Sequence, residues 1–414
     1  MQHRIKPENS GIRAEEMLQA VQACVHCGFC LAACPTYKQR GEEMNSPRGR
    51  IFLMKEVLEE GLQMDEARPY IDNCLGCMAC EPACPSGVLY GELLTGYRFL
   101  QEKRLDRSGA SGIIKKLLAH TLPYPRRLRF ALKSATLALP IRNLLPDSFQ
   151  PLLNMLPESL PKKERLPELS PAKGKRKGRV ALISGCAQSV LAPSINTTTI
   201  SVLNKCGFDV VVPSRQGCCG SILMHGGDEK GAQKLAGKNL TAFPKDVDAI
   251  ITNAAGCGSG IKEYSYLFKG HPLAEPAKAF AKKTMDICEF LAATDIRIDA
   301  LPSSARYAYQ DACHLKNAQG ISTQPRGLLQ SISNLTLVEL ADGGLCCGSA
   351  GTYNLEQPED ASRLGKAKVE AILSSDVEGV ISGNIGCITQ IRQHLGSRDL
   401  PVFHTIEVLD RACN

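Results

Sequence analysis

The second half of the chain alternates short apolar runs with segments of helical length. Six runs rich in β-branched and aliphatic residues recur from residue 179 onward: RVALISG, FDVVVP, DAIITNA, RYAYQDA, LTLVEL and EGVISGN. Each run has the length of one strand. Strands that alternate with helices are typical of βα units around a parallel sheet. The pattern therefore predicts α/β architecture in this half.

The first hundred residues have a different, helical pattern. In the segment NSPRGRIFLMKEVLEEG, Asn45 or Ser46 can cap a helix, and Pro47 suits its first turn. The apolar positions of this helix fall on one face, and they are Ile51, Leu53, Met54, Val57 and Leu58. We therefore expect helices, and not a long hairpin, in the first domain.

An internal repeat runs through the second half, marked by cysteines at matching positions. Each copy has a single cysteine, a Cys-Cys-Gly triplet and a last cysteine after a predicted strand, with equivalent positions 127 to 130 residues apart. The first copy has Cys186, Cys218, Cys219 and Cys257, and the second has Cys313, Cys346, Cys347 and Cys387. The repeat predicts two homologous α/β lobes related by a pseudo-twofold axis.

Breaks in composition divide the chain into four parts. No cysteine occurs between residues 90 and 184, and nine prolines between residues 123 and 171 predict short, interrupted helices. The predicted fold class is α+β multidomain: an α-helical first domain followed by two α/β lobes with CCG motifs. The predicted divisions are this first domain (14–104), a proline-rich basic helical linker (105–178), a first lobe (179–300) and a second lobe (301–414).

Composition narrows the functional classes. The 414 residues are 43% apolar, which suffices for ordinary globular cores, and they include 19 cysteines without an apolar signal-peptide core at the start. We expect the thiols to be metal ligands in a reducing cytosol. No run approaches the roughly 20 apolar residues of a spanning helix. The formal charge of +7 comes without any nucleic-acid-binding motif, so we expect no nucleic-acid partner.

The most specific motif is the run CxxCxxCxxxCP, which occurs twice. It reads CVHCGFCLAACP from residue 24 and CLGCMACEPACP from residue 74. In two-cluster ferredoxins, the first three thiolates of such a run bind one cubane cluster and the fourth binds the other. The first domain is therefore predicted to be an α-helical dicluster ferredoxin domain (14–104) with two 4Fe-4S clusters. One would be held by Cys24, Cys27, Cys30 and Cys84, and the other by Cys74, Cys77, Cys80 and Cys34. A zinc site is the alternative for any CxxC pair, but two such four-cysteine runs fit zinc poorly.

Three other residues near these runs have open roles. Arg48 and Arg50 either raise the potentials of the anionic clusters or are ordinary surface and packing arginines. His26 lies inside the first run, and because all four thiolates are present we expect it not to be a ligand.

The order of motifs resembles the CCG-containing iron-sulfur subunits of respiratory dehydrogenases, over nearly the whole chain. The anaerobic glycerol-3-phosphate dehydrogenase small subunit and heterodisulfide reductase subunits are similar more loosely. The chain looks most like the glycolate oxidase (glycolate dehydrogenase) iron-sulfur subunit family, in the segments CVHCGFC, CPTY, SPRGRIFLMKEV, CPSGVLY, LCCGSAGTYN and NIGC.

The resemblance implies an electron-transfer role. Partner subunits that carry flavin would oxidise glycolate to glyoxylate, and this chain would pass the electrons singly towards a membrane quinone. The chain has no GxGxxG or GxxxxGK[ST] motif of its own, so we expect the isolated chain not to be catalytic. The implied location is cytoplasmic, peripheral on the inner face of the cytoplasmic membrane.

The role of the repeated CCG cysteines stays open. They could hold an additional iron-sulfur cluster, hold zinc, or be buried structural thiols. In heterodisulfide reductases the motif ends in CxxC, whereas Gly260 and Gln390 stand at the completing positions here. This difference argues against the rival function of a thiol-disulfide reductase at the lobes. A second rival is the same relay in glycerol-3-phosphate or lactate oxidation.

The remaining candidates are less specific. His314, directly after Cys313, is a ligand, a proton donor or a packing residue. The basic segment at residues 113–145 contains no acidic residue and suits either a membrane surface, a partner or its own domain. Outside the repeats, Cys206, Cys288 and Cys413 are expected to be ordinary buried or free thiols.

Overall fold

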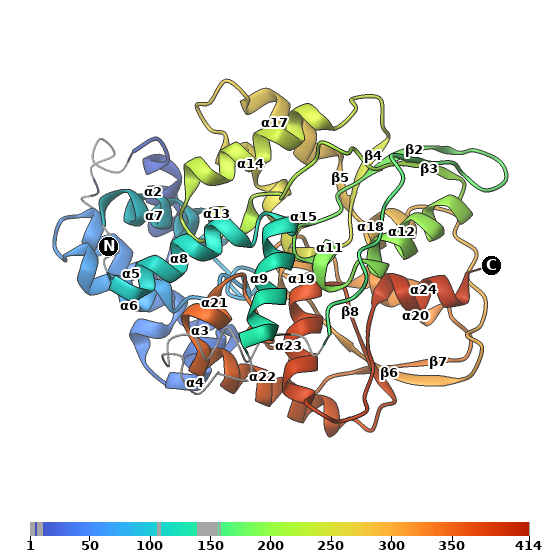
Figure 1. Cartoon of the computed structure of the whole chain (residues 1–414). Helices are drawn as coiled ribbons and strands as arrows, with labels where there is room; N and C mark the ends of the chain where they lie inside the picture. The colour runs from blue at the N-terminus through green and yellow to red at the C-terminus, as the bar shows by residue number, and fades with distance from the viewer. Residues whose placement is uncertain (1–4, 6–10, 106–108, 139–155, 157–158, 414) are drawn as a thin grey trace.

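The computed structural model describes residues 5, 11–105, 109–138, 156 and 159–413. It places a helical domain at one end of the molecule and two largely parallel sheets with their helices at the other (Figure 1). A helical domain next to two lobes of mixed helix and sheet agrees with the predicted α+β multidomain class. Of the predicted basic segment, residues 139–145 lie outside the described residues, as do all four prolines between residues 139 and 158.

The first domain consists of short helices around the two cysteine runs. At the start of α5, the hydroxyl of Ser46 accepts a hydrogen bond from the Gly49 amide at 2.9 Å, and Pro47 follows in the first turn. The predicted apolar face of α5 is buried, which confirms this helix. The helices are α2 (Ala14–Ala23), α3 (Phe29–Ala33), α4 (Pro35–Arg40), η1 (Glu43–Asn45), α5 (Pro47–Leu58), α6 (Met64–Asp72) and α7 (Tyr90–Arg104).

Two further helices, α8 (Gly109–Thr121) and α9 (Pro125–Ala138), lead from the first domain to the lobes. The short strand β1 (Leu169–Ser170) follows and pairs antiparallel with β3, although it falls in the predicted linker. The four-part division of the chain stays a prediction. Among the described helices, none has the length and apolarity to cross a membrane.

The first lobe has a sheet of order β1-β3-β2-β4-β5, parallel except for β1. Its strands are β2 (Gly178–Leu182), β3 (Phe208–Val211), β4 (Ala249–Thr252) and β5 (Thr284–Asp286). Its helices are α11 (Gln188–Leu191), α12 (Ser194–Lys205), α13 (Ser221–His225), α14 (Glu229–Ala242), α15 (Ala255–Lys262), α16 (Tyr264–Leu267), α17 (Ala274–Lys283) and α18 (Ile287–Ala292).

The second lobe repeats this plan with a parallel sheet of order β7-β6-β8-β9. Its strands are β6 (Ala305–Gln310), β7 (Leu335–Glu339), β8 (Gly379–Ser382) and β9 (Val402–His404). Its helices are α19 (Cys313–Lys316), α20 (Thr323–Gln330), α21 (Tyr353–Glu356), α22 (Pro358–Leu373), α23 (Ile385–Leu395) and α24 (Thr405–Ala412).

In both lobes the first strand lies between the second and the third, and the fourth forms the edge. The six predicted strands are confirmed as β2, β3, β4, β6, β7 and β8. The edge strands β5 and β9 have only three residues each, too short to give an alternating or continuous apolar run. The equal strand order agrees with the predicted repeat, while the pseudo-twofold axis stays a prediction.

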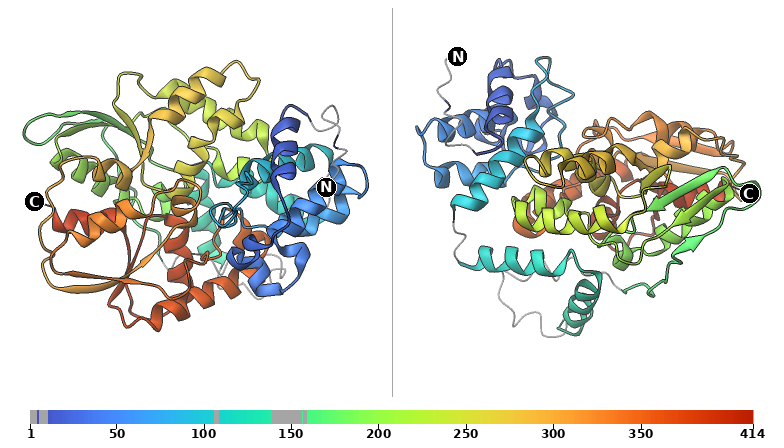
Figure 2. Two further views of the ribbon diagram at one scale, coloured as in Figure 1. Left: turned by 180° about the vertical axis from the view of Figure 1, so that it is seen from behind. Right: turned by 90° about the horizontal axis from the view of Figure 1, so that it is seen from above.

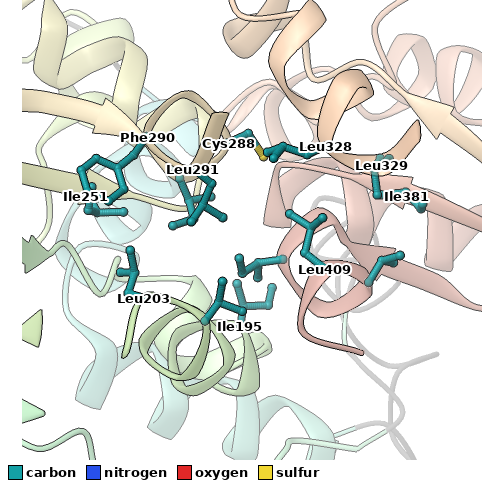
Figure 3. Packing of buried hydrophobic residues seen from close by; sticks show 14 of the residues in the cluster. Ile195, Leu203, Ile251, Cys288, Phe290, Leu291, Leu328, Leu329, Ile381 and Leu409 are labelled. Atoms are coloured by element: carbon teal, nitrogen blue, oxygen red, sulfur yellow. The ribbon is translucent and has the colours of Figure 1, made fainter. Parts of the chain in front are cut away.

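One apolar core joins the two lobes. Figure 3 shows Leu203 and Leu291 of the first lobe facing the same interior as Leu328 and Leu409 of the second. Helix α24 packs against α12, and Lys205 of α12 donates to the Cys413 carbonyl at 2.7 Å. Because this core is shared, the lobes are held in a fixed arrangement. The three cysteines outside the repeats are buried and free, as predicted: Cys206, Cys288 and Cys413.

The helical domain is fixed on the first lobe by a buried arginine. Arg13, 4% exposed, donates to the carbonyls of Tyr266 and Leu267, both at 2.9 Å, and pairs with Glu229 at 2.5 Å. The Tyr266 hydroxyl donates in return to the Glu92 carbonyl at 2.7 Å. These contacts set the orientation of the cysteine runs relative to the lobes.

Candidate iron-sulfur sites

The first site is a cavity near the surface of the helical domain. Its wall contains the four cysteines predicted for the first cluster, Cys24, Cys27, Cys30 and Cys84, together with Cys80. Cys27 is exposed, whereas the other three are partly buried. The structure thus brings the fourth cysteine of the second run to the first three of the first run.

The second site is a neighbouring cavity deeper in the same domain. Its wall contains the four cysteines predicted for the second cluster, Cys34, Cys74, Cys77 and Cys80. Tyr90 and Pro47 line both cavities, so the two sites are separated by a single layer of side chains.

The two cysteine loops share an unusual backbone conformation. His26 and Gly28 in the first loop have φ values of 54° and 87°, and Gly76 and Met78 in the second have 62° and 55°. For the two residues that carry a side chain, this left-handed conformation costs about 1 kcal/mol or more. The same left-handed conformation at matching positions of the two loops indicates a shared requirement. A cubane cluster fits that requirement, because such loops surround it with thiolates and backbone amides.

Arg50 is the charged group closest to the second site. It is 1% exposed, and its guanidinium lies 3.9 Å from the Cys34 sulfur while donating to the Tyr70 carbonyl at 2.7 Å and the Thr36 hydroxyl at 3.0 Å. Burial by itself lowers the pKa of Arg50. The nearby Cys74 and Cys34 thiols and the Tyr90 hydroxyl outweigh this effect and raise that pKa. The guanidinium therefore stays charged beside the cysteines.

Arg48 lies at the wall of the first site in a more open setting. It donates to the His26 carbonyl at 2.9 Å and pairs with Glu43 at 2.7 Å. Its charge is thus largely matched by a carboxylate. Of the two open interpretations for the arginines, a charge effect on the cluster suits Arg50 better than Arg48.

The third site is a cavity of about 240 Å³ between the two lobes and the second cysteine loop. The two CCG motifs, which the repeat assigns to separate lobes, both open onto it. Its wall contains seven of the eight repeat cysteines: Cys186, Cys219, Cys257, Cys313, Cys346, Cys347 and Cys387. The eighth, Cys218, lies behind them and accepts from the Gly220 amide at 3.4 Å. Nowhere in the described residues do three or more His, Cys, Asp or Glu side chains form a group suited to a single metal ion.

The glycine of each CCG motif is required by its backbone. Gly220 and Gly348 both have a φ of 86°, and a Cβ atom there would lie 2.9 Å and 2.7 Å from the carbonyls of Ala232 and Ala361. Each glycine thus lets the cysteine loop pass directly over a long helix, α14 or α22. The motif is therefore a packing device as well as a source of thiols.

We expect Gly348→Ala to destabilise the second lobe by about 2–4 kcal/mol, because it adds a steric clash to the cost of a positive φ. Gly320 provides the matched control, since it has a φ of 68° and a Cβ atom there would meet nothing within 4 Å. Gly320→Ala should cost only about 1 kcal/mol. Thermal unfolding of the two variant proteins measures the difference, and equal losses would contradict the clash.

The positions that complete CxxC in heterodisulfide reductases are occupied here for packing reasons. At Gly260, a Cβ atom would lie 2.0 Å from the Ser221 hydroxyl, so no cysteine side chain fits. Gln390 is 1% exposed and makes hydrogen bonds with Asn354 at 3.2 Å and the Ala361 carbonyl at 3.3 Å. The first position therefore leaves no room for a thiol, and the second is taken by a glutamine that buried hydrogen bonds hold in place.

Polar contacts fix the second cysteine loop against both lobes. His314 donates through Nε2 to the Gly76 carbonyl at 2.9 Å, and Asn317 donates to the Cys77 carbonyl at 3.0 Å. From the other side, Arg98 donates to the Cys74 carbonyl at 2.7 Å and the His225 carbonyl at 3.0 Å. Burial lowers the pKa of His314, in keeping with a packing role. Sequence reasoning missed Arg98 and Asn317, because no motif marks them.

The three cavities form a continuous row. Cys80 lines both the first and the second, and Cys74, Leu75 and Met78 line both the second and the third. Beyond them, the sulfurs of Cys313 and Cys346 lie 4.0 Å apart at the third cavity. Cysteine-lined sites therefore extend from the surface of the helical domain to the interior between the lobes.

Comparison with known families agrees with this arrangement. Residues 20–88 match the 4Fe-4S dicluster domain, and residues 180–262 and 307–392 each match the cysteine-rich domain, which confirms the predicted repeat. Fold and sites together define an iron-sulfur electron-transfer protein with a dicluster ferredoxin domain and a doubled cysteine-rich domain.

Relatives narrow this class. The probable glycolate oxidase iron-sulfur subunit of Bacillus subtilis is 37% identical over 89% of this chain and 88% of its own length. The glycolate oxidase iron-sulfur subunit of Escherichia coli is 35% identical over 97% of this chain and 96% of its own length. The chain belongs to the family of glycolate oxidase iron-sulfur subunits, as the resemblance predicted. The lactate utilization protein A of Exiguobacterium, 30% identical, covers 56% of this chain and 96% of its own length.

Proposed function

We propose that this chain is the electron-transfer subunit of a flavin-dependent complex that oxidises glycolate to glyoxylate and delivers electrons towards a membrane quinone. The observation that carries the proposal is the row of three cavities with shared walls, each lined by cysteines. When bound, 4Fe-4S clusters accept and release single electrons. The chain itself supplies thiolates, the strained loops and the buried charge of Arg50.

We assign the ligand sets by the crossover rule. Cys24, Cys27, Cys30 and Cys84 would hold the cluster near the surface, and Cys74, Cys77, Cys80 and Cys34 the deeper one. The repeat cysteines around the third cavity would hold a further iron-sulfur cluster. Support for this last assignment comes from their shared cavity and its common wall with the second site.

The surface around the first site is the proposed contact for the flavin subunits. Val25 and Phe29, on either side of the exposed Cys27, are each 67% exposed, and Leu89 is 55% exposed. A partner that covers these apolar side chains would exclude water next to the first site. The proposed location of the complex is the cytoplasm, peripheral on the inner face of the membrane.

The test is a dye-reduction assay on the chain purified anaerobically with its flavin subunits, using glycolate, lactate and glycerol-3-phosphate in turn. We expect reduction with glycolate that requires this chain. Reduction with lactate only would reassign the substrate, in line with the lactate utilization relative, and would leave the relay role intact. A complex that reduces the dye equally well without this chain would refute the relay.

A further inference from the structure

Helices α8 and α9 form an outer layer on one side of the molecule, visible at the lower edge of the right-hand view in Figure 2. Their inner faces are part of the fold: Leu118 and Leu128 are each 5% exposed. Lys115 donates to the Gly226 carbonyl at 2.7 Å and lines the third cavity. The pair of helices is therefore held in place at the side of the molecule where the two lobes meet.

The outer faces of the same helices are apolar and basic at once. Ile113 and Leu117, one turn apart on α8, are 69% and 50% exposed, and Phe130 on α9 is 74% exposed. Three exposed cations recur on the same faces at helical spacing: Lys116, Arg126 and Lys133. In a helix, positions three and four residues apart share one face. Each helix thus presents a stripe of apolar and cationic side chains to its surroundings.

The positive charge of the outer faces of α8 and α9 favours an anionic partner. Residues 109–138 contain no aspartate or glutamate. Lysine is depleted at protein-protein interfaces, whereas cations next to apolar side chains suit lipid headgroups above acyl chains. The negative surface potential of an anionic bilayer attracts each lysine and arginine that lies near it. An anionic lipid surface therefore matches both components of the stripe.

We propose that the α8–α9 surface, made by Ile113, Lys116, Leu117, Arg126, Phe130 and Lys133, docks on an anionic lipid membrane. The inference rests on the proposed relay function and gives it a defined membrane contact. Because the inner face of α8 reaches the third cavity through Lys115, docking brings that cavity within about one helix diameter, roughly 10 Å, of the headgroups. The first site, with its exposed Val25 and Phe29, remains available for the flavin subunits.

The test is co-sedimentation of the full chain, purified with its iron, with vesicles of phosphatidylcholine alone or mixed with phosphatidylglycerol. We expect binding to the mixed vesicles only, weakened by salt. The triple variant Lys116→Gln, Arg126→Gln, Lys133→Gln should bind on the order of a hundredfold more weakly. The variant Ile113→Ser, Leu117→Ser, Phe130→Ser should lose about tenfold or more.

A matched control separates docking from general surface hydrophobicity. Leu169 and Leu373 lie outside this surface and are 54% and 45% exposed. The double variant Leu169→Ser, Leu373→Ser should therefore bind the mixed vesicles as the unchanged protein does. Dye reduction by the complex in solution needs no vesicles, so the relay and the docking can fail separately. Unchanged protein that stays unbound at low salt would overturn the proposal. The proposal would also be overturned if purified flavin subunits bound the unchanged chain but not the charge variant, because this surface would then be a protein contact.

Discussion

A chain that lacks both Cys27 and Cys34 should lose both ferredoxin-type clusters, whereas a chain that lacks both Cys27 and Cys84 should lose only one. The reason is the crossover: Cys84 shares the first cavity with Cys27, but Cys34 lies in the second. Each pair removes two thiols from the same domain, so the comparison isolates how the ligands are distributed. We expect about half of the ferredoxin-domain iron to remain in Cys27→Ala, Cys84→Ala, and almost none in Cys27→Ala, Cys34→Ala.

Iron and sulfide quantification with EPR, after anaerobic reconstitution, measures these outcomes. The single variants Cys34→Ala and Cys84→Ala serve as controls, and each should retain one cluster signal. If clusters were confined to one run each, the pattern would reverse, and the chain without Cys27 and Cys34 would keep half of this iron. That reversal would contradict the crossover assignment.

The ferredoxin domain was predictable because its information is local. Three cysteines of each set lie within one turn-forming segment, and a known spacing rule supplies the fourth. The helix between the runs follows from Ser46, Pro47 and one apolar stripe, all within a dozen residues. Such features are specified by neighbouring residues and need no knowledge of tertiary contacts.

The common cavity of the lobes could not be predicted in the same way. The repeat shows two sets of cysteines but not that both open onto one space, because this depends on a core shared by residues more than two hundred positions apart. The same holds for Arg98, which joins the second cysteine loop to the first lobe through two carbonyls. Single polar residues of this kind carry no motif, and their role exists only in the folded chain.

The largest expected effect on redox properties comes from Arg50. We expect Arg50→Met to lower the midpoint potential of the deeper cluster by on the order of 100 mV. Two unit charges about 6 Å apart at an effective dielectric constant near 20 interact with roughly 3 kcal/mol, and a one-electron potential changes by about 59 mV per 1.4 kcal/mol. Removing the cation withdraws this stabilisation from the reduced, more negative cluster. A redox titration followed by EPR measures the shift.

Two further variants make the charge effect distinguishable from a loss of structure. Arg50→Lys keeps the charge. The midpoint potential of the deeper cluster should therefore stay close to that of the unchanged protein, even where the hydrogen bonds to Tyr70 and Thr36 are lost. Arg48→Met removes a cation that is already paired with Glu43 and more exposed to water, so the first cluster should shift far less. Equal shifts in Arg50→Met and Arg50→Lys would mean that Arg50 acts through packing. Equal shifts in Arg50→Met and Arg48→Met would mean that burial does not increase the effect of the arginine charge on the cluster potential.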